Sequence, residues 1–403
     1  MVPMSVANAA TVMSAQALRQ FCLDNEIEVV LPGLDAMALT LSRHKALFDE
    51  AGISIPIPDY DVIRRGVDKS RLMGCVNSAG LPCARTVHLR SESDIQKITS
   101  LAYPVIAKAA IGHGARSVQI YEHPPADWSS LKNALKIGEM LVQEYIPGHA
   151  GSIHGCCFLF DRNHEIRLMF QQKSLKTEFD FGGAALAGVS VRDPELLLCA
   201  EKLIREIGPW VGIVMLEFKR HAQTGEFYAM DCNARLWGLS AMAQDSGLSF
   251  PYAAVLVAKN KNFRRHDDYL TGIHTERHGL SDRSTYTFSC GKSVDRLPLT
   301  SYRTNERRTI ALIKEDNAEN WIATTLADPR IFAVIVVKRD AGPINFGQQH
   351  NKVYLWVPPP HLVEGDLTYW MAHLFRATDV QVMDGESLST VSRNDLQNAR
   401  WSA

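Results

Sequence analysis

The alternation of apolar and polar positions predicts a mixture of helices and strands along most of the chain. Apolar residues recur at helical spacing in the segments 15–25, 35–51, 68–80, 91–101, 130–137, 194–208, 239–247 and 251–259. Strand-like patterns occupy the segments 28–32, 104–109, 118–121, 140–146, 153–160, 165–172, 212–219 and 226–232. Helices and strands that follow one another in this way are typical of the α/β class. The polar segment 174–183 is expected to be a loop.

The most informative stretch is a predicted hairpin made by the strands 212–219 and 226–232. Its turn is centred near Thr224, in a Thr-Gly pair that favours hairpin loops. Side chains alternate between the two faces of a strand, so this turn places Glu217 opposite Asp231. A register shift of two residues leaves both carboxylates on one side of the hairpin.

Asn233 and Arg235 continue the face that carries Asp231 if the chain stays extended. Two close carboxylates repel each other unless a cation lies between them or one of them takes up a proton. Mg²⁺ prefers carboxylate and amide oxygens. The hairpin therefore predicts a divalent-cation site, and the alternative is a solvated hairpin with ordinary surface charges.

A second candidate site follows the strand 104–109, which carries Lys108 near its end. The loop 111–117 contains Gly112 and Gly114. Glycines let backbone N–H groups approach the oxygens of a phosphate, and a lysine supplies a positive charge. The pattern predicts a phosphate-binding loop, with a plain turn beside a surface lysine as the alternative.

Composition narrows the class of protein. The 403 residues are 46% hydrophobic and 22% charged, which predicts a globular protein of two or three domains. A net charge of −1 gives no general attraction to nucleic acid or anionic membranes. The eight cysteines form no CxxC pair, no apolar run reaches membrane-spanning length, and the N-terminus lacks a signal-peptide pattern. We therefore expect a cytoplasmic protein in a reducing compartment.

The pattern of the last third of the chain predicts a separate small α/β domain. Strands are predicted at 284–290, 309–314, 331–337 and 352–357, and helices at 321–326 and 367–375. The strands 309–314 and 331–337 are almost continuously apolar, which predicts a buried parallel pair. The segment 266–283 is polar and is expected to be irregular.

Several segments, taken in their order and spacing, resemble the ATP-grasp enzymes of the branch that includes biotin carboxylase and carbamoyl-phosphate synthetase. They are DKSRLM, YPVIAKAA before the glycine loop, LVQEYIPG, FQQK, MLEFKR and YAMDCNARLWG. The resemblance covers about residues 68–259, and more loosely 28–56. It implies a partial N-terminal α/β domain at 1–67, an ATP-grasp domain at 68–260 with a lid at about 102–147, and an extra C-terminal α/β domain at 261–403.

The resemblance also implies the residues that hold the nucleotide. Lys69 and Lys108 would contact its phosphates, as would the loop glycines Gly112 and Gly114. The adenine would lie against a hinge between the lobes. This hinge is formed by Gln143, Glu144, Tyr145 and Ile146.

The remaining positions that match the family's motifs are expected to serve catalysis. Lys173 would reach the adenine or the phosphates. Glu217 and Asp231 would hold Mg²⁺ with help from Asn233, with two ions expected and Mn²⁺ as a possible substitute. Arg235 would face the transferred phosphoryl group or the acyl phosphate.

The activity implied is that of an ATP-dependent carboxylate–amine ligase that forms an amide, peptide or lactam through an acyl phosphate, in specialised small-molecule biosynthesis. Its partners would be small-molecule, amino-acid-like acids and amines, and a homodimer is possible. The acid would lie near Arg235, Lys173, Lys176 and the segment 179–183. Asp231 stands where the family usually has glutamate, so a second hypothesis is a degenerate ATP-grasp scaffold that binds nucleotide or a partner without turnover. The third hypothesis is that the protein is an ATP-grasp phosphotransferase.

Overall fold

The computed structural model describes residues 15–111, 118–179 and 181–278 and, beyond them, the backbone of six strands. The helices are α1 (Ala15–Asp24), α2 (Asp35–Arg43), α3 (Lys45–Asp49), α4 (Tyr60–Val67), α5 (Lys69–Ser78), α6 (Ser129–Leu135), α7 (Pro194–Ile207), α8 (Ser240–Asp245) and α9 (Phe250–Ala258), with 3₁₀ helices η1 (Glu92–Ser100) and η3 (Ala150–Ser152). The strands of the first two sheets are β1 (Thr86–Leu89), β2 (Val105–Ala109), β3 (Gln119–Tyr121), β4 (Met140–Glu144), β5 (Ile153–Phe160), β6 (Ile166–Phe179), β7 (Gly182–Ser190), β8 (Gly212–Arg220), β9 (Phe227–Asn233), β10 (Ile273–His278) and β11 (Ser281–Tyr286).

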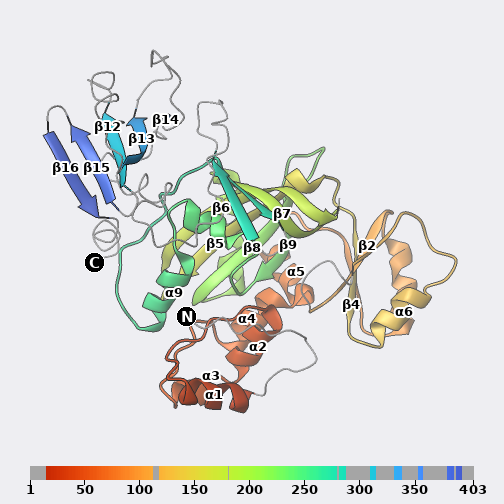
Figure 1. The fold of residues 1–403 in the computed structure, drawn as a ribbon. Helices are drawn as coiled ribbons and strands as arrows, with labels where there is room; N and C mark the ends of the chain where they lie inside the picture. The colour runs from red at the N-terminus through yellow and green to blue at the C-terminus, as the bar shows by residue number, and fades with distance from the viewer. Residues whose placement is uncertain are drawn as a thin grey trace.

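The N-terminal segment, 15–67, consists of four helices joined by non-helical stretches. Helices α1 to α4 lie along one side of the central sheet (Figure 1). The predicted strand 28–32 is wrong, because only Val29 pairs there, through a single parallel bridge to Ser54. With one short extended neighbour and no further strand to pair with, this segment cannot build a sheet. The predicted helix 35–51 is interrupted at His44, whose backbone leaves the helical conformation between α2 and α3.

A small four-stranded antiparallel sheet, in the order β1-β4-β2-β3, stands to one side of the central sheet in Figure 1. Residues from η1 and α6 pack on it around Val105, Leu131 and Val142. The predicted strands 104–109, 118–121 and 140–146 are confirmed as β2, β3 and β4. The predicted helix 91–101 is a 3₁₀ helix, capped by Ser91, whose side chain and that of Asp94 form a capping box.

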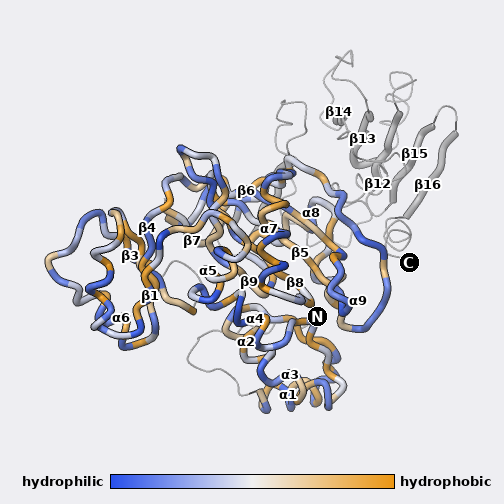
Figure 2. The backbone as a smooth tube through the Cα atoms, turned by 180° about the vertical axis from the view of Figure 1, so that it is seen from behind, coloured by the Kyte–Doolittle hydropathy of each residue, from blue (hydrophilic) through white to orange (hydrophobic). Residues whose placement is uncertain are grey.

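The central sheet has seven strands in the order β11-β10-β7-β6-β5-β8-β9. Strands β5 and β8 are buried along nearly all of their length, and Figure 2 shows their hydrophobic positions. Helix α7 packs beside them, with its N-terminus capped by Asp193 and started by Pro194. The predicted hairpin is confirmed as β8 and β9, and Glu217 pairs with Asp231 in its register.

The predicted loop 174–183 is wrong. Strand β6 continues through this segment to Phe179, and β7 then pairs antiparallel with it. Strand β10 pairs in turn with β7, where the sequence predicted an irregular segment at 266–283. Polar side chains in the second half of β6 and in β10, and the glycines and alanines of β7, hid these strands, because a strand ladder depends on backbone hydrogen bonds to a neighbour and does not require an amphipathic pattern. Strand β11 begins three residues before the predicted strand 284–290 and overlaps its residues 284–286, and residues 287–290 lie outside the described part of the chain.

A third sheet joins β14 (Val353–Trp356), β13 (Ile331–Val337), β12 (Thr309–Lys314), β15 (Asp379–Asp384) and β16 (Ser387–Ser392), in that order. The predicted parallel pairing of 309–314 with 331–337 is confirmed. Strands β15 and β16 were not predicted from the sequence. The predicted helices 321–326 and 367–375 lie outside the described residues. Within the described part of the chain, no helix combines the length and apolar character needed to cross a membrane.

Candidate functional site

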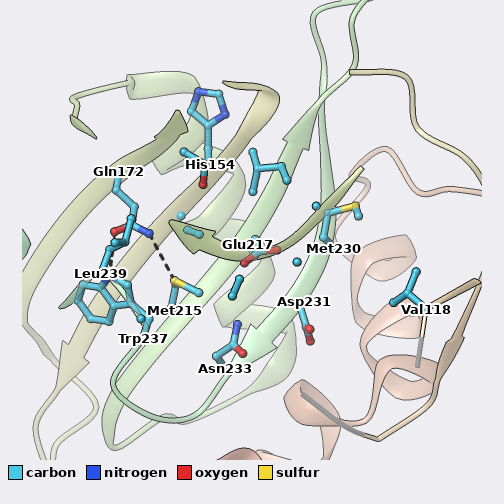
Figure 3. Close-up of a pocket in the computed structure, with 18 of the residues that line it drawn as sticks. Val118, His154, Gln172, Met215, Glu217, Met230, Asp231, Asn233, Trp237 and Leu239 are labelled. Carbon is cyan, nitrogen blue, oxygen red and sulfur yellow. Dashed lines mark hydrogen bonds between the residues drawn. The ribbon is translucent and has the colours of Figure 1, made fainter. Parts of the chain in front are cut away.

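A cavity of about 280 Å³ lies between the small sheet and the central sheet. The small sheet contributes Lys108 and its strand neighbours, and the central sheet contributes residues of β5 to β9. Figure 3 shows several of the lining side chains around Glu217. The charged and amide side chains of the lining are Lys69, Lys108, Gln172, Glu217, Asp231, Asn233 and Arg235.

The two carboxylates of the hairpin face each other at the centre of this cavity. Glu217 and Asp231 are cross-strand partners, so their side chains leave the sheet on the same face. Burial raises the pKa of Glu217 to about 7, and the nearby Asp231 adds to the rise, against the opposing effects of Lys69, Lys108 and Arg235. The Glu217 carboxylate accepts no hydrogen bond from the described residues. The residue is half-buried beside the cavity, so water or a bound cation can reach its carboxylate.

Two buried lysines supply the positive charge of the site. Lys69 is the first residue of α5 and follows the N-cap residue Asp68. Its Nζ lies 2.9 Å from Oδ2 of Asp231. Lys108 donates to the carbonyl oxygen of Met230 at 3.4 Å. Burial and the neighbouring Lys69 lower the pKa of Lys108 to about 8. Burial alone would also lower the pKa of Lys69, but Asp231 reverses the shift and raises it.

Arg235 is fixed at the end of β9 by contacts on both sides of its guanidinium group. Its Nε donates to Oδ2 of Asp35 at 2.9 Å, and its Nη2 donates to Oδ1 of Asn233 at 2.8 Å. The other oxygen of Asp35 accepts from the backbone N–H of Ala234 at 3.1 Å. Asn233 and Arg235 thus stay on the cavity face, as the strand alternation predicted.

A group of uncharged residues closes the cavity beyond Glu217. Trp237 donates from Nε1 to Oε1 of Gln172 at 2.8 Å, and Figure 3 shows the Gln172 amide between Trp237 and Met215. Sequence reasoning missed Gln172 and Trp237 as lining residues, although both fall in segments that carried the family resemblance. It also missed Asp35, for which the sequence offers no signal.

Some predicted site residues are not part of this cavity lining. Gln143 is buried and donates to Oγ1 of Thr86 at 2.7 Å, and Glu144 accepts from the backbone N–H of Ala102 at 2.9 Å. Tyr145 and Ile146 continue the same segment. Gly112 and Gly114 lie outside the described residues, so their predicted contact with phosphate stays a prediction.

Lys173 is likewise not among the residues that line the cavity. It pairs across the sheet with His154, whereas its neighbours Gln172 and Ser174 line the cavity. Because adjacent residues of a strand point to opposite faces, Lys173 leaves β6 on the face opposite to Gln172 and Ser174, and its Cε lies near Gly151. Its predicted contact with the adenine or phosphates stays a prediction that this geometry does not favour.

The donor set fits a hard divalent cation. Glu217, Asp231 and Asn233 present two carboxylates and an amide on one face of the hairpin, and Mg²⁺ takes oxygen ligands of this kind. The described residues contain no group of three or more His, Cys, Asp or Glu side chains that could hold a metal by themselves. An ion here would need further oxygen ligands from water or from a bound phosphate.

Comparison with known proteins identifies the class of domain. Residues 67–239 match the family model of the ATP-grasp domain. This part of the chain is therefore an ATP-grasp domain, as its sequence motifs indicated. A comparison with curated protein sequences finds no match.

Solved structures share the fold. Pyruvate carboxylase of Rhizobium etli aligns with a TM-score of 0.55 and 16% identity over 64% of this chain and 24% of that chain. The biotin carboxylase domain of Hydrogenobacter thermophilus 2-oxoglutarate carboxylase, in complex with MgADP and bicarbonate, aligns with a TM-score of 0.55 and 20% identity over 68% of this chain and 62% of that one. N5-carboxyaminoimidazole synthetase of Staphylococcus aureus, complexed with ADP, aligns with a TM-score of 0.53 and 16% identity over 65% and 68%. The chain thus spans less than two thirds of the first two proteins, and these likenesses show the fold alone.

Proposed function

We propose that this protein is an ATP-dependent carboxylate–amine ligase. The observation that carries the proposal is the meeting of two buried lysines, Lys69 and Lys108, with the carboxylate pair Glu217 and Asp231 in one cavity of an ATP-grasp domain. Positive side chains suit the phosphates of a nucleotide, and the carboxylate pair suits its Mg²⁺ ion. Two proteins that share the fold were solved with ADP, and one of these with magnesium.

The proposed reaction has two steps. A carboxylate oxygen of the acid attacks the γ-phosphorus of ATP, so that a carbon–oxygen–phosphorus linkage forms and ADP leaves. The nitrogen of an amine then attacks the acyl carbon, phosphate leaves, and the nitrogen loses a proton. The chain's part is to position the reactants and to stabilise charge, because little covalent chemistry falls to the protein in such transfers.

Each charged residue has a proposed role in that reaction. Glu217 and Asp231, with Asn233, would hold the ion, which neutralises charge on the phosphates when it is bound. Lys69 and Lys108 would bind the phosphate oxygens. Arg235 would bind the transferred phosphoryl group or the acyl phosphate through its remaining N–H groups.

The finer assignments remain predictions. They comprise an adenine hinge at 143–146, a second ion or Mn²⁺, amino-acid-like substrates, a homodimer and the division of the chain at residues 67 and 260. A reducing, cytoplasmic location fits the cysteines of the described residues, which are all free thiols.

Nucleotide binding can be tested before any substrate is known. Isothermal calorimetry on the wild type should show ATP binding that strengthens with Mg²⁺. The variant Glu217→Ala/Asp231→Ala should lose the Mg²⁺-dependent part, because both carboxylates that face the ion are gone. Glu226→Ala, which removes an exposed carboxylate from the same hairpin, is the matched control and should bind as the wild type does. A folded wild type that binds no Mg·ATP would refute the proposal.

Mg·ATP affinity should pass through a maximum between pH 7 and pH 8. Glu217, with a pKa of about 7, holds a cation only when deprotonated, so affinity should rise as the pH approaches 7 from below. Lys108, with a pKa of about 8, attracts phosphate only when protonated, so affinity should fall above pH 8. Each limb can change affinity by up to about tenfold per pH unit. Calorimetry across pH 6 to 9 measures this, and a high-pH limb that survives in Lys108→Met would contradict the assignment to that lysine.

Product analysis distinguishes the ligase from its alternatives. With a matching acid and amine, the ligase releases ADP and free phosphate and forms an amide. A phosphotransferase would instead leave a phosphorylated product. A scaffold would bind Mg·ATP and release no ADP with any acid–amine pair.

A further inference from the structure

The guanidinium group of Arg235 is held by three contacts that leave part of it free. Nε bonds to Asp35, Nη2 to Asn233, and Nη1 to the carbonyl oxygen of Leu236 at 3.1 Å. A guanidinium group carries five N–H groups. One N–H therefore remains on each terminal nitrogen, which is enough for a bidentate contact with an oxyanion in the cavity that Arg235 lines.

The charged anchor among these contacts comes from a distant part of the sequence. Asp35 is the first residue of α2 and lies 200 residues before Arg235. Its side chain is only 4% exposed. Both of its oxygens are used by the end of β9, one by Arg235 and the other by the backbone N–H of Ala234.

The segment that carries Asp35 is seated closely against the central sheet. A Cβ atom added to Gly212, at the start of β8, would lie 1.8 Å from the carbonyl oxygen of Pro56. Leu31, Pro32 and Ile57 of the same segment surround a pocket of only about 10 Å³ together with Ala234, Arg235 and Leu236. Such close packing fixes the distance between α2 and the end of β9.

We propose that Asp35 is a positioning residue for the reaction, which holds the Arg235 guanidinium and the backbone of Ala234 in the orientation that the transferred group needs. The proposal rests on the proposed function of the cavity and deepens it. It gives the N-terminal segment a role in the chemistry, in addition to its packing. A free Arg235 could adopt many rotamers, and a displacement of about 1 Å can lower a rate by a factor of about 100.

The test compares Asp35→Asn with Arg235→Lys and with the double variant. Asparagine has the shape of aspartate and still accepts from Ala234, but it loses the charge that faces Arg235. Asp35→Asn should lower kcat for acid- and amine-dependent ADP release by about 10- to 100-fold, and leave the Kd for Mg·ATP within about threefold of wild type. The double variant should be no slower than Arg235→Lys alone, within about threefold, because Asp35 acts through Arg235.

A second readout needs no substrate. Arginine-selective ¹⁵N labelling gives Nε–H signals, and the signal of Arg235 is the one that disappears in Arg235→Lys. In the wild type this proton should exchange slowly with solvent, and in Asp35→Asn it should exchange at least about tenfold faster. Asp35→Glu should restore part of the protection.

The control is Glu28→Gln, which breaks the ion pair between Glu28 and Lys259. This pair also joins the N-terminal segment to the rest of the protein, but it lies at the surface. It should change neither the exchange rate nor kcat. The positioning role is overturned if Asp35→Asn leaves the exchange of Arg235 unchanged, or if the losses of Asp35→Asn and Arg235→Lys add in full. Absence of turnover in the wild type would instead count against the ligase, and the exchange measurement would still decide whether Asp35 holds Arg235.

Discussion

Replacing Lys108 by methionine should reduce ATP-dependent turnover by about 100- to 1000-fold. Lys108 is 8% exposed and places its ammonium group within the cavity, near the carbonyl oxygen of Met230. Methionine keeps most of the buried aliphatic stem and removes the charge. A charge that is already in place when negative charge develops in a water-poor site is worth far more than the same charge in water. Initial rates of ADP release with a matching acid and amine measure the loss.

The matched control is Lys132→Met, which removes an exposed lysine from α6 in the same lobe. It should keep turnover within about twofold of wild type, because an exposed charge far from the cavity is screened by solvent. Thermal melting should show both variants folded. If Lys108→Met turned over within tenfold of the control, Lys108 would not act at the phosphate site.

The variant Lys173→Met tests whether the family resemblance or the strand geometry predicts the role of Lys173 correctly. If the family resemblance is right, the loss of turnover should be large, because the resemblance implies that Lys173 contacts the adenine or the phosphates. If the strand register decides, the loss of turnover should be less than about tenfold, since Gln172 and Ser174 line the cavity and Lys173 lies on the opposite face of β6. The same ADP-release assay decides between the two.

Gly212→Ala should destabilise the protein by at least about 3 kcal/mol. The backbone of Gly212 has a φ of +83°, and an added Cβ would lie 1.8 Å from the carbonyl oxygen of Pro56. A left-handed backbone alone costs a non-glycine residue about 1–2 kcal/mol. The clash cannot be relieved by rotating a side chain, because the close atom belongs to the backbone. The N-terminal segment would have to move away from β8.

Gly225 provides the matched control for this prediction. It lies in the turn of the same hairpin with a φ of +76°, and nothing lies within 4 Å of its added Cβ. Gly225→Ala should therefore cost only the backbone strain. Urea unfolding of the two variants measures the difference, and failure of Gly212→Ala to fold would agree with the expectation. Equal destabilisation by the two substitutions would show that the contact with Pro56 is not tight.

The elements that the sequence predicted well are those whose pattern is local. Strands β5 and β8 are continuously apolar, and helix α7 has an aspartate cap, a proline at its start and an apolar stripe. The same local logic placed Glu217 opposite Asp231, because a turn of known centre fixes the register of a hairpin. The ATP-grasp domain was recognised from motifs of this kind.

The elements that were missed depend on their neighbours. Strand β7 is rich in glycine and alanine, and it is a strand because β6 and β10 pair with its two edges. The segment 28–32 has a strand pattern but lacks a sheet to join, so it contributes only the bridge at Val29. Local propensity alone gives the wrong answer in both cases, because tertiary pairing decides whether a segment becomes a strand.

By itself, the sequence determined the domain class, the central hairpin and the charged residues that chemistry would require. Apart from the pair Glu217 and Asp231 within that hairpin, only the tertiary structure decided which of these side chains meet. It brought Lys69 to Asp231, placed Lys173 on the face of β6 opposite to Gln172 and Ser174, and placed Asp35 against Arg235. The physical reason is that strand alternation and helix spacing fix relations over a few residues, whereas a contact across 200 residues exists only after the N-terminal segment has packed against the central sheet.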